Sequence, residues 1–242
     1  MALTCDPFVQ RRLLELARLD QALAGAVHRR RTLPELALIE SGTDQVTQLR
    51  GAQALAEAEV SDLDRAERKL TTEIEQVRAR AERDGQRLAS GSGPAKDLTN
   101  LQHEIETLHR RQGVLEDQTL ELMERRETAE QALSEATAAL DEAQGRLTAA
   151  QQRRDDVFAE LEQDTGRLTA ERAQAASGVP TDVLGLYERI HATGKIAAAE
   201  LVGSRCGACR IDLDRTALAA VHAAKVDAVV RCDECGAVLI RS

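Results

Sequence analysis

Four of the chain's five cysteines form two Cys-x-x-Cys pairs close to its C-terminal end. Cys206 and Cys209 make the first pair, Cys232 and Cys235 make the second, and 22 residues separate the pairs. Two residues between cysteines allow a tight turn to direct both sulfur atoms at one ion, and Zn²⁺ prefers a tetrahedral set of sulfur or nitrogen ligands. The spacing therefore predicts one Zn²⁺ ion held by four cysteines.

Glycine accompanies both turns, since Gly207 lies inside the first pair and Gly236 directly follows the second. Glycine accepts positive φ angles and lets backbone N–H groups approach the sulfur atoms. Four protein ligands leave no coordination position for water, so the predicted zinc is structural rather than catalytic. The alternative is two unlinked redox dithiols, but the thioredoxin type of motif belongs to a βαβ context that this sequence lacks.

The other residues that bind metals or act as nucleophiles have no predicted role. Cys5 stands alone at a terminus that we expect to be frayed, and four cysteines leave His191 and His222 no place as ligands. The sequence contains no Ser–His–Asp order, no glycine-rich phosphate loop and no His-Glu-x-x-His motif. It therefore predicts a protein that is not an enzyme.

The remainder of the chain must position this site, and it is built mainly from Ala, Leu, Glu, Arg and Gln. Charged residues make up 30% and aromatic residues 1% of the 242 residues, which favours long helices or a coiled coil over a thick globular core. Apolar residues recur at alternating intervals of three and four from Val46 to Leu88, and again from Leu98 to Ala175. This period predicts two long helices that supercoil left-handedly.

Glycine, serine and proline mark the ends of these helices. The stretch ASGSGPAKD at 89–97 predicts a tight turn, and long helices joined by a short loop are most simply antiparallel. Pro34, with Ser41 and Gly42 after it, predicts a break in the first arm, and Thr43 and Asp44 are candidate caps of the helix that follows. The expected helices of that arm run from about residue 7 to 32 and from about 43 to 88.

The sequence as a whole predicts a mainly α fold, in which a long antiparallel coiled-coil helical hairpin carries a small C-terminal α+β zinc-ribbon domain. The hairpin occupies residues 1–176, with its turn near 89–96 and its break near 33–43, and the ribbon domain occupies 181–242. Within the ribbon, TDVLGLYERIHA and DRTALAAVHAA are typical of helices, and VDAVVRC and AVLIRS are typical of strands. So few aromatic side chains make a poor core, and we expect zinc to supply folding energy there.

Charge along the hairpin predicts which residues face each other. Folding the chain at residues 92–93 makes two positions neighbours when their numbers sum to about 185. The ion pairs predicted in this way join Arg110 and Arg111 to the neighbourhood of Glu73 and Glu75, and Arg125 and Arg126 to that of Glu57 and Glu59. Such flanking pairs would fix the register of the two helices.

The same rule brings basic residues of both arms to one level. The members of this arginine cluster are Arg29, Arg30, Arg31, Arg153 and Arg154. They are candidates for binding an anionic partner, either an RNA backbone or an acidic protein helix. The alternative is an ordinary solvated face.

The chain resembles the bacterial C4-type zinc-ribbon proteins that have a long N-terminal helical hairpin. The resemblance rests on LYERI, on the two Cys-x-x-Cys pairs with glycine after the second, on AVLI, and on GPAKDLTNLQHEIETLHRRQ after the turn. Asp97 and Leu98 stand where Glu and Tyr are common in the family. The resemblance implies an intramolecular coiled-coil hairpin that carries a zinc ribbon. One flagellar branch is known as a partner of an alternative sigma factor and as an mRNA-binding regulator, but no residue here identifies that partner.

Two functions fit these features. The first is a non-enzymatic adaptor, whose rod and zinc ribbon mediate protein–protein interaction, with transcription as one setting. The alternative is a regulator that binds RNA or DNA through the ribbon and the arginine cluster. Residues 181–242 contain eight basic and eight acidic residues, and Zn²⁺ with four thiolates adds a charge of about −2. The ribbon therefore lacks the positive charge that nucleic-acid binding normally needs, which favours the adaptor.

The sequence also predicts where the protein works and in what state. We find no run of about 18 apolar residues and no signal-peptide core, so we expect a cytoplasmic protein that does not contact membranes. A monomer with an intramolecular coiled coil is favoured. A dimer is the alternative, because heptad seams can also pair between chains.

Overall fold

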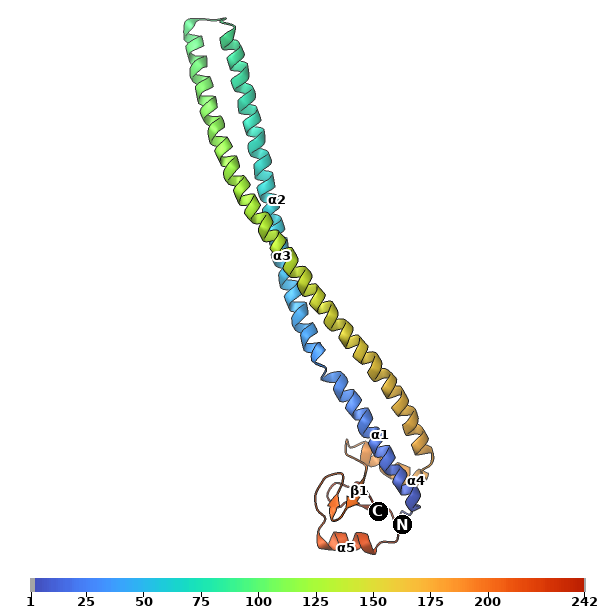
Figure 1. The fold of residues 1–242 in the computed structure, drawn as a ribbon. Helices are drawn as coiled ribbons and strands as arrows, with labels where there is room; N and C mark the ends of the chain where they lie inside the picture. Colours follow the sequence, from blue (N-terminus) through green and yellow to red (C-terminus); the bar gives the residue numbers. More distant parts are fainter. Residues whose placement is uncertain (1–2, 242) are drawn as a thin grey trace. The chain divides into compact units, whose positions relative to one another are not determined.

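The computed structural model describes residues 3–241, and long helices dominate it (Figure 1). The helices are α1 (Pro7–Arg31), α2 (Pro34–Ala89), α3 (Ala95–Ser177), α4 (Thr181–His191) and α5 (Arg215–Ala223). The strands are β1 (Ala198–Val202), β2 (Arg205–Cys206), β3 (Val230–Arg231) and β4 (Val238–Ile240). The predicted fold class, a mainly α hairpin with a small C-terminal strand region, is confirmed.

Contacts divide the chain into two compact units. The hairpin unit is Ala37–Gln151, and the ribbon unit is Met1–Leu36 together with Gln152–Ser242. This division differs from the predicted one at residues 176–181, because α1 and the last part of α3 group with the ribbon.

In the hairpin unit, α2 and α3 run antiparallel beside each other and are joined by a short loop at residues 90–94 (Figure 1). Seam positions predicted from the heptads are the buried ones, among them Val46, Leu63, Ile74, Leu115, Leu140 and Ala143. Gln53, a polar seam position, donates from its side-chain amide to Thr137 Oγ1 at 3.1 Å. The hairpin therefore closes on a mainly apolar seam, and the side-chain amide of Gln53 is satisfied across the helix pair.

Some ion pairs across the hairpin follow the predicted register and others do not. Arg111 lies 3.6 Å from Glu73, as predicted. Arg126 instead pairs with Glu67 at 2.9 Å and with Asp64 at 3.6 Å, so its predicted position near Glu57 and Glu59 was wrong. The numbers of the paired residues Gln53 and Thr137, and of Arg126 and Asp64, both add to 190 instead of about 185, so the register there is offset from the predicted one. Arg110 bonds to Thr107 on its own helix, and Arg125 forms no ion pair with another described residue.

The predicted break at 33–43 was too long. The interruption consists of Thr32 and Leu33, and α2 begins at Pro34, where a missing N–H removes no helical hydrogen bond. The candidate caps Thr43 and Asp44 lie inside α2 and do not begin a helix. The hydroxyls of Ser41 and Thr43 donate to backbone carbonyls one turn back, at 3.0 Å and 2.7 Å. The first helix, expected over about 7–32, is confirmed as α1.

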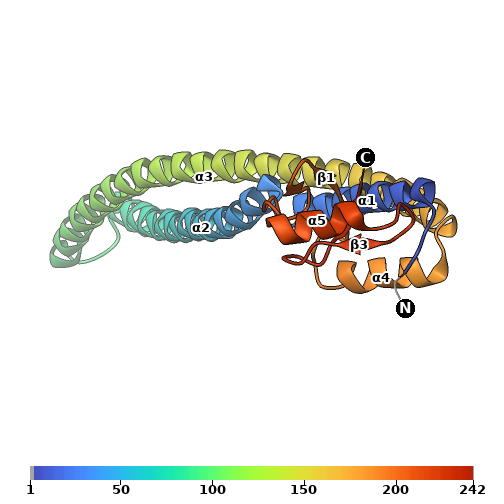
Figure 2. The same ribbon diagram turned by 90° about the horizontal axis from the view of Figure 1, so that it is seen from below.

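The ribbon unit contains a four-stranded sheet in the order β2-β1-β4-β3. β1 is antiparallel to β2 and parallel to β4, and β3 is antiparallel to β4. α1 packs against β1 and β4 (Figure 2), and its Leu13 and Leu16 share a buried core with Val183, Tyr187 and Val238. The predicted strands at 226–232 and 237–242 are present in shorter form. The central strand β1 was not predicted, because Ala-Ala-Glu has low strand propensity.

Both ends of the chain hold the loop between α5 and β3. Cys5 donates its N–H to the Asp227 carbonyl at 2.7 Å, and Val229 donates to the Leu3 carbonyl at 3.0 Å. Arg241 donates to five backbone carbonyls, those of Val221, Ala224, Lys225, Val226 and Ala228. The expectation that Cys5 is frayed was wrong. Its side chain is buried, and burial raises the pKa of its thiol.

A buried carboxylate joins three helices of the ribbon unit. Asp20 of α1 is buried, and it accepts from the Tyr187 hydroxyl at 2.6 Å and from Arg172 Nη2 at 3.3 Å. Arg172 also bonds to Glu188 at 2.8 Å. We call Asp20, Arg172, Tyr187 and Glu188 the Asp20 cluster. A buried charge is tolerated when it is paired and hydrogen-bonded in this way, so the cluster fixes α4 relative to α1 and α3.

Replacing Tyr187 by Phe tests the Asp20 cluster. Tyr187 is the chain's only tyrosine, and burial, followed by its bond to Asp20, raises its pKa above the ordinary value near 10. The folded state therefore keeps a proton that the unfolded state loses above about pH 10, so stability falls as the pH rises past that value. We expect the wild-type melting temperature to fall more steeply above about pH 10 than that of Tyr187→Phe. Equal slopes, with tyrosinate absorbance appearing at the ordinary pH, would contradict this role.

Two glycines inside the helices of the hairpin unit predict a gain in stability on substitution. A Cβ atom built at Gly51 or at Gly113 meets nothing within 4 Å. Alanine disfavours the unfolded chain and favours helix, so Gly51→Ala and Gly113→Ala should each stabilise the hairpin by about 0.5–1 kcal/mol in thermal unfolding followed by circular dichroism. The control is Gly91→Ala in the loop, where φ is +64° and alanine should destabilise instead.

Candidate metal centre

Two backbone turns of the same design present the four cysteines. In the first, the Arg210 N–H donates to the Cys206 carbonyl at 2.9 Å, and in the second the Gly236 N–H donates to the Cys232 carbonyl at 2.8 Å. The residue after each pair is left-handed, with φ of 61° at Arg210 and 80° at Gly236. The predicted use of glycine is therefore confirmed at Gly236, whereas the first turn accepts the strain of a left-handed arginine.

Gly207 serves a different purpose from Gly236. Its N–H donates to the Glu200 carbonyl of β1 at 2.9 Å, and a Cβ atom at this position would lie 2.8 Å from the same oxygen. The glycine therefore lets the first cysteine turn lie directly against the strand. This contact joins the metal site to β1, which lies inside the sheet between β2 and β4.

The four sulfur atoms have the spacing of a tetrahedral thiolate site. Cys206 Sγ lies 3.8 Å from Cys235 Sγ, and Cys209 Sγ lies 3.9 Å from Cys232 Sγ. All four sulfur atoms lie within 4.8 Å of one another. A zinc ion with bonds of about 2.3 Å to four sulfur atoms requires sulfur separations of about 3.8 Å. The donor set and its dimensions therefore fit one Zn²⁺ ion, and the predicted four-cysteine zinc site is confirmed.

The surroundings of the sulfur atoms make metal binding part of folding. Cys206 and Cys232 are buried in a small core with Leu201, Val221 and Leu239. Burial raises the pKa of the Cys206 thiol and raises that of Cys235 to about 12, whereas the Ile211 N–H lowers the pKa of Cys209. Bound zinc supplies a cross-link between the two turns, and uptake of the ion releases thiol protons. Four sulfur ligands leave no open position, so the site is structural.

The histidines near the ribbon are not part of this site, as predicted. The four cysteines are the only cluster of three or more metal-binding side chains among the described residues. His191 Nδ1 lies 3.6 Å from Asp20 Oδ2, beside the Asp20 cluster. His222 lies in the last turn of α5, where a basic side chain complements the helix dipole.

The arginine cluster has a partly internal role. Arg30 lies over the Phe158 ring, with its Cζ atom 4.7 Å from the ring centroid, and this contact joins the end of α1 to α3. Arg154 pairs with Asp155 at 2.7 Å. The last turn of α1 also holds Arg29 and Arg31, which are exposed and complement the helix dipole there. Arg29, Arg31 and Arg153 form no ion pair with another described residue.

Two features of the ribbon unit escaped the sequence analysis. Asp20 continues the buried series Leu13, Leu16 and Ala17 of α1, and this position is a signal that could have predicted a buried carboxylate. Arg241 gave no such signal, because its five carbonyl partners become neighbours only when α5 and β4 pack together.

Known proteins share both parts of this architecture. A family model described as a CT398-like coiled coil hairpin domain matches residues 16–195, and a C4-type zinc ribbon domain matches residues 205–239. The chain belongs to the CT398-like hairpin family. The uncharacterized protein Rv2229c of Mycobacterium tuberculosis is 40% identical over 232 residues, which cover 96% of this chain and 95% of the relative.

Solved structures of family members have the same fold. A protein from Mycobacterium smegmatis is 40% identical and aligns with a TM-score of 0.85 over 99% of this chain and 100% of the other. CT398 from Chlamydia trachomatis is 16% identical, with a TM-score of 0.65 over 97% of this chain and 98% of the other, so it supports the fold alone. The matches to the two domain models confirm the family predicted from the sequence.

The helices formed by residues 3–241 include none that is both long and apolar enough to cross a membrane.

Replacing Cys232 by Ser tests the metal centre. We expect the wild-type protein to hold one zinc ion per chain by elemental analysis. Cys232→Ser should lose the ion and unfold the ribbon, because the buried turn loses its cross-link, while the circular dichroism of the long helices changes little. The control is Cys5→Ser, which removes a buried thiol that is not a ligand and should keep the zinc. Full zinc content in Cys232→Ser would overturn the assignment.

Proposed function

We propose that this structural zinc-binding protein is a non-enzymatic adaptor, in which the coiled-coil hairpin and the zinc ribbon bind partner proteins. Four sulfur ligands close the metal site, so zinc has no position for a substrate or for a reactive water. A metal centre of this kind maintains a surface instead of performing a reaction. We place this function in the cytoplasm, and we propose a monomer whose hairpin closes within one chain.

The observation that carries the proposal is the charge balance of the zinc-loaded ribbon. Basic and acidic residues are equal in number over 181–242, and the zinc–thiolate group adds negative charge. A nucleic-acid interface gains most of its affinity from an excess of Lys and Arg over the phosphates. Tyr187, the one aromatic side chain of the ribbon, is buried in the Asp20 cluster and is not available to stack on a base.

A second candidate function rests on the exposed arginines of the ribbon unit. Arg29, Arg31 and Arg153 are exposed, and no described carboxylate neutralises them. Three such cations support weak, salt-sensitive binding of an anionic polymer. The internal contacts of Arg30 and Arg154 reduce the predicted five-residue cluster to these three.

One experiment separates the two functions. Binding of a fluorescent single-stranded RNA is measured across a salt series for the zinc-loaded wild type, for Arg29→Ala/Arg31→Ala/Arg153→Ala, and for the control Arg50→Ala/Arg68→Ala/Arg83→Ala, whose exposed arginines lie in the hairpin unit. The adaptor predicts dissociation constants no tighter than about 10⁻⁶ M at physiological salt, which is the non-specific range, with both variants alike.

The adaptor function also requires that a partner protein be found. This is tested in the cells from which the protein comes. After chemical cross-linking and ribonuclease treatment, the tagged full-length protein should retain a protein partner in stoichiometric amount. Tight RNA binding that only the first triple variant loses, without any protein partner, would reverse the choice in favour of a nucleic-acid regulator.

A further inference from the structure

An exposed aromatic side chain stands at the start of α1. Phe8 is 68% exposed, although the chain contains only two phenylalanines and no tryptophan. The other phenylalanine, Phe158, is covered by Arg30. Exposing a phenylalanine to water forfeits the free energy of burying its ring, and aromatic side chains are enriched at the centres of protein interfaces.

Beside Phe8, the fold holds a guanidinium group that has no carboxylate partner among the described residues. Arg12 lies with its Cζ atom 6.0 Å from the Phe8 ring centroid. Its Nη1 atom occupies the place that a Cβ atom at residue 178 would take, since the two positions are 1.5 Å apart. Gly178, whose φ is not left-handed, therefore leaves room for this side chain at the end of α3.

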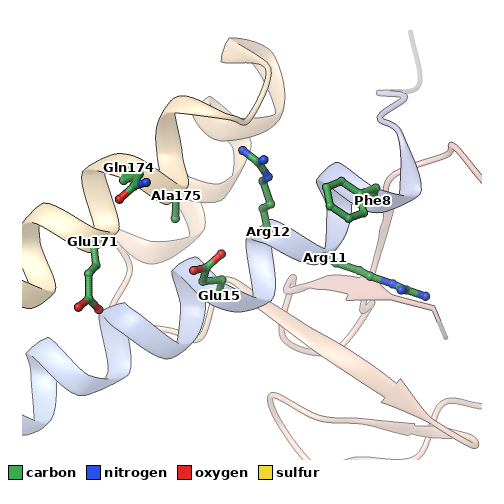
Figure 3. A pocket seen from close by; sticks show the side chains of 7 residues that line it. All are labelled: Phe8, Arg11, Arg12, Glu15, Glu171, Gln174 and Ala175. Atoms are coloured by element: carbon green, nitrogen blue, oxygen red, sulfur yellow. The ribbon is translucent and has the colours of Figure 1, made fainter.

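These side chains line a cavity of about 520 Å³ between α1 and α3 in the ribbon unit (Figure 3). Arg12 and Glu15 project from α1 into it, Glu171 and Gln174 face them from α3, and Ala175 lies between the helices. Arg11 extends away from α3 at the edge of the cavity. The volume falls within the range of about 300–1,000 Å³ that is typical of binding pockets.

We propose that this cavity is the docking site for a short segment of a partner protein that carries one carboxylate beside an apolar side chain. The Arg12 guanidinium would bind a carboxylate of the segment, and Phe8 with Ala175 would cover an adjacent apolar side chain. A guanidinium fork matches a carboxylate in shape and charge, which is why arginine recurs at such contacts. This inference rests on the proposed adaptor function and gives that function a location and a partner chemistry.

The cavity fits a protein segment better than a nucleic acid. Glu15 and Glu171 lie on its wall, and their charges repel a phosphate backbone that must pass along the groove. A single carboxylate that reaches Arg12 avoids this repulsion, and a polar donor elsewhere on the segment can bond to the two glutamates. The mixed charge and exposed aromatic ring together are typical of a protein interface.

The test uses the zinc-loaded full chain and a phage-display library of random dodecapeptides. Peptides selected on the wild type should carry Asp or Glu next to an apolar residue. The selected peptide, made synthetically, should bind Phe8→Ala and Arg12→Gln about tenfold or more weakly than the wild type. Arg18→Gln, an exposed arginine of the same helix that does not line the cavity, is the matched control and should bind as the wild type does. Circular dichroism and zinc content verify that each variant is folded.

Several results would overturn the proposal: no selected peptides, selection of basic peptides, or equal binding by wild type and Phe8→Ala. A labelled RNA that competes with the peptide and loses affinity in Arg12→Gln would also overturn it, in favour of an anion site. The outcome for the adaptor is measured separately. If Phe8→Ala still retains the cross-linked protein partner, the docking site is wrong and the adaptor function stands. If the wild-type protein retains no protein partner, both the docking site and the adaptor function are wrong.

Discussion

Four sulfur atoms held within bonding distance of one ion are the constraint on which the ribbon depends. The buried core around the sulfur atoms contains few large side chains, chiefly Leu201, Val221 and Leu239. So small an apolar core would stabilise the folded ribbon only weakly without the metal. A zinc ion adds bonds that a small apolar core cannot supply. It joins two turns that follow the two edge strands of the sheet, β2 and β3.

Polar contacts add to the apolar core in holding the rest of the ribbon unit, in a chain that has almost no aromatic residues. The Asp20 cluster joins α1, α3 and α4 through one buried carboxylate. Arg241 closes the loop before β3 with five hydrogen bonds, and Cys5 reaches the same loop from the other end of the chain. Bonds of this kind are directional, so they fix one arrangement of small side chains that packing alone would leave loosely specified.

The arginines of the ribbon unit differ in whether their side chains are used within the fold or are free to bind a partner. Arg30, Arg154 and Arg172 are occupied within the ribbon unit, by an aromatic ring, by Asp155 and by the Asp20 cluster. Arg12 has no carboxylate partner among the described residues, and the ring that it contacts, 6.0 Å away, belongs to the exposed Phe8. A free guanidinium next to exposed apolar surface is a better mark of a binding site than a count of arginines, because occupied side chains must first be released before they can bind.

The sequence by itself determined the zinc ligands, the two long helices and their antiparallel turn, because cysteine spacing and a 3,4 repeat are local patterns with one economical solution. Tertiary structure decided the rest. Ser41 and Thr43 lie inside a helix, where their hydroxyls bond to backbone carbonyls, because α2 already begins at Pro34. Between them, Gly42 lies close to Leu147 of α3. The central place of β1 and the burial of Cys5 and Asp20 depend on partners more than 25 residues away. No local preference encodes such contacts, since they exist only after the elements have packed together.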